Sequence, residues 1–179
     1  TMKPFSRTIL KMNSGHIKNK FFQTLYIMQT AVKVNVTKLF TFEMAHALLG
    51  YDGDCRNIHG HSYRLQVTVR GQPLSAPDHP KDGMVMDFGD LKKLVNREVI
   101  DRLDHALVLN EKTAEALVAL LKQHFEKIVL TPFQPTCENL LLDIVARLRN
   151  RLPRELELFR VILHETATAY AEWCCTDEA

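Results

Sequence analysis

The sequence lacks several features that would indicate a membrane protein, a disulfide-rich or zinc-finger protein, a zinc hydrolase or a nucleic-acid-binding protein. No run reaches the roughly 18 apolar residues of a membrane span, so we expect no membrane partner. The four cysteines do not have the spacing of a disulfide framework, which favours a reducing cytoplasm, and they include no C-x-x-C pair, which argues against a zinc finger. H-E-x-x-H is absent, which argues against a zinc hydrolase with helix-borne ligands. The net charge of +2 gives no case for a nucleic-acid partner.

Acidic residues are absent from residues 1–42, although the chain has 21 of them. This segment superficially matches an organelle transit peptide, but it is poor in arginine and lacks a helical stripe. We interpret residues 1–33 as an N-terminal extension rather than an integral element, with Met28 as a candidate start. Residues 34–175 are predicted to form one domain, long enough to bury a core.

Hydrophobic periodicity predicts the secondary structure of this domain. Alternating apolar residues indicate strands over 34–48 and 59–71, and the second places Tyr63, Leu65, Val67 and Val69 on one face. The remaining predicted elements are a short extended piece over 84–88, helices over 89–106, 111–128 and 131–153, and one or two strands over 156–174. This order predicts an α+β fold, with helices on one face of an antiparallel sheet.

Three histidines form a candidate metal site. His59 and His61 are two residues apart at the start of a strand, so both side chains point to one face. His46 ends the preceding strand, and antiparallel pairing would bring it beside them. Three imidazoles with an open fourth position predict a catalytic Zn²⁺ that acts as a Lewis acid. The alternative is that these are ordinary strand and loop histidines.

Cys55 precedes this pair in the segment "CRNIHGHSY". It could be a further ligand, but its spacing is not that of a usual finger, and a thiol near a cation should be partly ionised. We therefore favour a base or nucleophile. Asp104 and His105 are weak candidates alone; they matter only if the fold carries them to Cys55, where they could relay a proton.

Two carboxylates complete the set of candidates. Glu138 follows a predicted N-cap, Thr136, and could simply compensate the helix dipole. Glu165 interrupts an apolar strand, where a buried carboxylate is costly without a partner. Its two oxygens could bind the adjacent N–H groups of a pterin or guanine.

Six motifs occur together in one order: "FEMAHAL", "CRNIHGHSYRLQV", "GMVMDFGDLK", "LDHALVLN", "PTCENLLLDI" and "LHETATAYAEW". With them the chain resembles the 6-pyruvoyl-tetrahydropterin synthase superfamily over residues 34–175. The Cys-x3-His-Gly-His spacing resembles its 6-carboxy-tetrahydropterin synthase branch, which serves queuosine (7-deazaguanine) biosynthesis.

The resemblance implies a tunnelling fold, in which the sheets of three subunits close a barrel and two trimers stack into a hexamer with sites between subunits. It implies a cytoplasmic carbon–carbon lyase that converts 7,8-dihydroneopterin triphosphate to 6-carboxy-tetrahydropterin, acetaldehyde and triphosphate. Alternatives are a 6-pyruvoyl-tetrahydropterin synthase, which would retain the side chain, and a non-catalytic zinc- or pterin-binding protein.

The resemblance also implies residue roles. His46, His59 and His61 match the zinc ligands, and Cys55 matches the general base. Asp104 and His105 match the proton-relay pair, and Glu165 matches the carboxylate that anchors the pterin ring. Thr136, Cys137 and Glu138 match the P-T-x-E-N segment that lines the pterin pocket. Three features depart from the family: the long stretch 111–128, Cys137 where a small residue is expected, and His164, which we interpret as structural.

Overall fold

The computed structural model describes residues 32–177, so nearly all of the predicted extension (1–33) lies outside the described residues. Every element that the structure describes lies in the compact unit that begins at Lys33. In chain order these are β1 (Val34–His46), η1 (Asp54–Arg56), β2 (His59–Gly71), α2 (Phe88–Val95), η2 (Asn96–Ile100), α3 (Asp101–Leu103), β3 (Ala106–Asn110), α4 (Glu115–His124), β4 (Ile128–Thr131), α5 (Cys137–Arg149), β5 (Glu157–His164), β6 (Tyr170–Cys174) and η3 (Cys175–Asp177).

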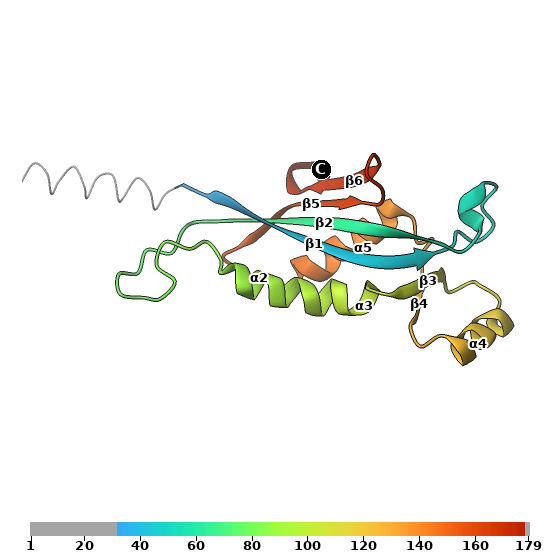
Figure 1. The fold of residues 1–179 in the computed structure, drawn as a ribbon. Coiled ribbons are helices and arrows are strands. Elements are labelled where there is room, and N and C mark those ends of the chain that lie inside the picture. Colours follow the sequence, from blue (N-terminus) through green and yellow to red (C-terminus); the bar gives the residue numbers. More distant parts are fainter. Residues whose placement is uncertain (1–31, 178–179) are drawn as a thin grey trace, which may run out of the picture. The chain divides into compact units, whose positions relative to one another are not determined.

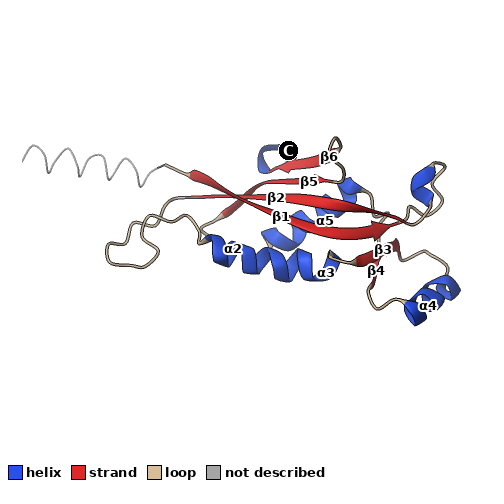
Figure 2. Cartoon of the chain, viewed as in Figure 1, coloured by secondary structure: helices blue, strands red, loops and turns tan. Residues whose placement is uncertain are grey.

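The strands form one sheet in the order β4-β3-β1-β2-β5-β6. Pairing is antiparallel from β1 through β2 and β5 to β6, as predicted, whereas β3 pairs in parallel with β1 and with β4. Helices α2 and α5 lie on the same side of the sheet, and α4 lies at one end beyond β3 and β4 (Figures 1 and 2). The predicted α+β architecture is confirmed, with a mixed sheet.

The two long strands form the predicted hairpin because their side chains alternate between two environments. Phe42 pairs with Tyr63 and Phe40 with Leu65, and all four side chains are buried. The Phe42 and Tyr63 rings stack with centroids 5.1 Å apart. Alternate side chains along both strands therefore share the buried face, which we call the helix-covered face.

Two helical segments cover that face. From Phe88 to Leu103 the chain is helical, with η2 as a π-helical turn in the middle; the Asp87 side chain caps its start. Helix α5 begins after Thr136, whose hydroxyl accepts a hydrogen bond from the Asn139 N–H. Each segment buries an apolar stripe against the sheet, made of Leu91, Leu94, Val95 and Val99 in the first and Leu140, Leu141, Ile144, Val145 and Leu148 in the second.

Three local predictions were wrong. Residues 84–87 are in no strand, and Phe88 begins a helix. The helix predicted over 89–106 ends at Leu103, because Ala106 starts β3 against the edge of β1. Helix α4 is shorter than the predicted 111–128, because Ile128–Thr131 pairs with β3 as β4. Short apolar segments beside a free strand edge form strands where periodicity alone favours helices.

Within the described residues, no helix has the length and apolar character needed to cross a membrane.

Candidate functional site

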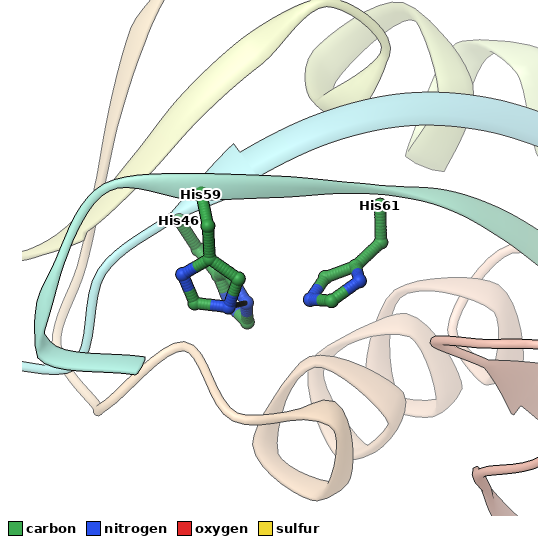
Figure 3. Close-up of side chains that lie close together, drawn as sticks. All are labelled: His46, His59 and His61. Carbon is green, nitrogen blue, oxygen red and sulfur yellow. Dashed lines mark hydrogen bonds between the residues drawn. The ribbon is translucent and has the colours of Figure 1, made fainter. Parts of the chain in front are cut away.

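Three histidines meet where β1 ends and β2 begins. His46 is the last residue of β1 and pairs with His59, the first residue of β2, while His61 pairs with Met44. All three side chains lie on the helix-covered face, because they continue the alternation that buries Phe42 and Tyr63 (Figure 3). Their nearest ring nitrogens all lie within 4.8 Å of one another. We call His46, His59 and His61 the metal triad.

The hydrogen bonds of two triad members determine their tautomers. Nδ1 of His46 lies 2.7 Å from the Pro135 carbonyl, and Nδ1 of His59 lies 2.9 Å from the Asn57 carbonyl. A carbonyl only accepts, so each Nδ1 carries the proton and each neutral ring presents an Nε2 lone pair. These two Nε2 atoms are 3.1 Å apart. Facing lone pairs repel unless a cation lies between them, so the arrangement fits a metal ion.

Burial favours the form of His46 that binds metal. Its side chain is 3% exposed, and burial is the main cause that lowers its pKa below the usual 6.5. Neutral imidazole is the metal ligand, and a carbonyl on its other nitrogen orients the ring. Among the described residues, the triad is the only group of three or more His, Cys, Asp or Glu side chains whose ligand atoms lie within 4.8 Å of one another.

Cys55 lies in η1, within the loop that joins β1 to β2, and is partly exposed. Its thiol is outside the cluster formed by the triad. The Cys55 carbonyl accepts from the Leu48 N–H at 2.9 Å, which closes the loop.

Asp104 and His105, the relay pair, form the turn between α3 and β3. His105 Nδ1 lies 3.0 Å from Asp104 Oδ1, and the same oxygen accepts the Glu43 N–H at 2.9 Å. That N–H is the main cause of the lowered pKa of Asp104. His105 has φ 58°, a left-handed conformation uncommon outside glycine, and its N–H donates to the Glu43 carbonyl at 2.6 Å.

The structure does not bring the relay pair to Cys55 within one chain. Among the described residues, no hydrogen bond or ion pair joins Asp104 or His105 to Cys55 or to the triad. The pair borders a hollow of about 960 Å³ instead, together with Glu43 and Ser62, whose side chains point away from the helix-covered face, and with His61.

Glu165 is adjacent to the triad. It begins the turn between β5 and β6, immediately after the strand in which the sequence placed it. Its Oε1 accepts the Tyr63 hydroxyl at 3.1 Å and lies 3.7 Å from His46 Nε2. Burial and the Glu165 charge raise the pKa of Tyr63, so its hydroxyl stays a donor. Sequence reasoning missed Tyr63, because its place in an apolar row marked it only as core.

The side chains at the start of α5 include a helix cap, an exposed carboxylate and a buried thiol. Thr136 caps the helix, and Glu138 is exposed in its first turn. Cys137 is buried, and its thiol donates to the Leu163 carbonyl at 3.3 Å. Burial raises the pKa of this thiol to about 11. His164 contacts Gln66 and Tyr170 and is not part of the triad, as predicted.

Comparison with known proteins identifies the family. The model of the family described as 6-pyruvoyl tetrahydropterin synthase matches residues 35–174. The chain belongs to this family. The prediction of an enzyme of this family is confirmed, and the triad supplies a place where it could hold a metal ion.

Relatives within the family include proteins named 6-carboxy-5,6,7,8-tetrahydropterin synthase. The one from Haemophilus influenzae is 36% identical over 141 residues, which cover 77% of this chain and 96% of that protein. The one from Aquifex aeolicus is 32% identical over 167 residues, covering 79% of this chain and 98% of that protein.

Solved structures support the fold. The 6-pyruvoyl tetrahydropterin synthase of Caenorhabditis elegans superposes with a TM-score of 0.56 at 26% identity and covers 80% of this chain and 96% of that chain. An uncharacterised protein from Wolinella succinogenes has a TM-score of 0.62 at 19% identity, covering 80% of this chain and 99% of that one. The tunnelling fold predicted for the single chain, a sheet with helices packed on one face, is therefore confirmed.

Proposed function

We propose that this chain is a zinc-dependent 6-carboxy-5,6,7,8-tetrahydropterin synthase of queuosine biosynthesis, acting in the cytoplasm. It would convert 7,8-dihydroneopterin triphosphate and water to 6-carboxy-5,6,7,8-tetrahydropterin, with release of acetaldehyde and triphosphate. The observation that carries this proposal is the triad, whose facing Nε2 lone pairs fit a cation, in a chain with relatives of that name over nearly their whole length.

His46, His59 and His61 would hold Zn²⁺, since three neutral imidazoles with a free fourth position suit a catalytic zinc ion. When bound, the ion supplies Lewis acidity toward the hydroxyls of the substrate side chain. The Pro135 and Asn57 carbonyls keep the rings of His46 and His59 in the required tautomer.

Cys55 would act as the general base that removes a proton from the substrate side chain. Its position outside the triad supports a role in proton transfer rather than in metal binding. Asp104 and His105 would relay protons, with Asp104 orienting the His105 ring through the 3.0 Å contact.

Among the described residues, no hydrogen bond or ion pair joins the relay pair to Cys55 in one chain, which supports a site completed by a second copy. We therefore propose a homo-oligomer, a hexamer built as a dimer of trimers, in which one subunit offers the triad and Cys55 and its neighbour offers Asp104 and His105. Glu165 would bind the pterin ring, and Thr136, Cys137 and Glu138 would line its pocket. Cys137 would do so through its main chain, because its thiol is directed to Leu163.

The product distinguishes this proposal from the other activity in the family. With dihydroneopterin triphosphate as substrate, acetaldehyde should be released and a 6-carboxy pterin should accumulate. A pyruvoyl side chain retained on the ring would show a 6-pyruvoyl-tetrahydropterin synthase instead, the activity in the name of the Caenorhabditis elegans neighbour.

Two variants distinguish the role of Cys55 in catalysis from the role of the triad in binding zinc. Cys55→Ala should keep a full equivalent of zinc, measured by atomic emission, and lose turnover. His59→Ala should lose both. Loss of zinc from Cys55→Ala would make Cys55 a ligand and contradict the role proposed for it.

A further inference from the structure

Tyr63 is held rigidly beneath the site. Its side chain is 0% exposed, although it is among the larger side chains of the chain. One face of its ring stacks on Phe42, with an interplanar angle of 6°, and its ring lies edge-on to that of His61 at 5.7 Å. A ring packed in this way has little rotational freedom, so its hydroxyl oxygen occupies one place.

The hydroxyl contacts one oxygen of Glu165 and leaves the other available. Oε1 accepts the Tyr63 hydroxyl at 3.1 Å and lies 3.7 Å from His46 Nε2. Among the described residues, none forms a hydrogen bond or ion pair with Oε2. The Glu165 side chain is 24% exposed, so a ligand can reach it.

Without Tyr63 the carboxylate would be free to move. Glu165 lies in a turn, and the backbone bond from its N–H to the Ala169 carbonyl does not restrain its side chain. The nearest alternative partner of Oε1 is the Nε2 edge of the triad. The Tyr63 hydroxyl is a fixed donor that holds Oε1 and leaves Oε2 to a ligand.

We propose that Tyr63 is a positioning residue, whose buried hydroxyl fixes Glu165 so that the carboxylate presents its free oxygen to the ring N–H groups of the pterin. This inference rests on the proposed function, in which Glu165 binds that ring. The distinguishing feature is the single Tyr63–Glu165 hydrogen bond between the strand that carries His61 and the turn after β5.

The test compares Tyr63→Phe with Tyr170→Phe in the zinc-loaded protein. Both variants lose one phenolic hydroxyl, but Tyr170 is 59% exposed and does not contact Glu165. Calorimetric titration with 7,8-dihydroneopterin should show roughly tenfold weaker binding for Tyr63→Phe, because binding must then order the freed carboxylate. Tyr170→Phe should bind like the unmodified protein.

Two further readouts separate positioning from a structural role. Tyr63→Phe should keep its zinc and its cooperative unfolding, with a melting temperature lowered by the lost hydrogen bond, while KM for the triphosphate substrate rises and kcat changes little. In a cycle with Glu165→Gln, removing the Tyr63 hydroxyl should weaken pterin binding no further, because the carboxylate that it positions is no longer there.

Equal pterin binding by Tyr63→Phe and the unmodified protein, with binding lost in Glu165→Gln, would overturn the inference alone. The hydroxyl would then merely satisfy its own burial. Failure of the unmodified protein to bind dihydroneopterin, or unchanged binding by Glu165→Gln, would overturn the role of Glu165 and the inference together.

Discussion

Asp104 shows how one main-chain contact determines the behaviour of a residue. The Glu43 N–H holds the pKa of this carboxyl below its usual 3.8, and His105 adds to the effect. The folded state therefore favours the ionised form. This stabilisation is fully present above pH 3.8 and is lost as the pH falls through the lower folded pKa.

We expect Asp104→Asn to lower the melting temperature at pH 7, since the amide keeps an acceptor for Glu43 but loses the charge. The difference from the unmodified protein should shrink as the pH falls below about 3.8. Scanning fluorimetry from pH 7 to pH 3 would measure it. A gap that stays constant or widens in acid would contradict the role of the charge.

Cys137 and Cys55 should differ in reactivity. Burial raises the pKa of the Cys137 thiol to about 11, so only about one thiol in a thousand is ionised at pH 8. Brief iodoacetamide treatment followed by peptide mass spectrometry should find Cys55 alkylated and Cys137 intact. In urea both should react, which is the control. Equal labelling in the folded protein would refute the buried position of Cys137.

At the scale of elements, α5 depends on its first residue. The Thr136 hydroxyl accepts from the Asn139 N–H at 3.3 Å and satisfies a free donor at the helix start. Thr136→Ala should lower the free energy of unfolding by about 1 kcal/mol in urea denaturation. Thr136→Ser keeps the hydroxyl and should retain most of that stability. If Ser and Ala lose the same amount, the hydroxyl does not stabilise the helix.

Alternation along β1 and β2 was enough to predict the hairpin and the common face of His59 and His61. It could not predict β3 and β4, because mostly apolar segments of five and four residues carry no period that distinguishes a strand from the end of a helix. Nor could it predict the contacts of His46 with Pro135 and of Tyr63 with Glu165, which join residues 89 and 102 positions apart. Such pairs exist only once the whole sheet has formed.

At the scale of the whole molecule, one chain holds the two parts of the proposed site without joining them. Cys55→Ala and His105→Asn should each be inactive alone. Unfolding and refolding the two together should give mixed oligomers in which some sites combine an intact Cys55 with an intact relay pair. Their activity should reach roughly a quarter of the unmodified level, as expected for random mixing.

Refolding each variant alone is the control and should restore nothing. Mixed oligomers, verified by mass spectrometry, that stay inactive would show that each chain uses its own relay pair.

Strand β1 connects these parts in a way that limits which length changes the protein can accept. It carries His46 at its end, and three residues earlier Glu43 holds both residues of the relay pair through its N–H and carbonyl. Deleting one residue from the middle of β1 would turn His46 away from His59 or withdraw Glu43 from Asp104. Additions in the connecting segments 47–58 and 111–127 change neither the pairing of His46 with His59 nor the contact of Glu43 with Asp104. Insertions and deletions should therefore be tolerated in those connecting segments, whereas β1 should tolerate substitutions but neither insertions nor deletions.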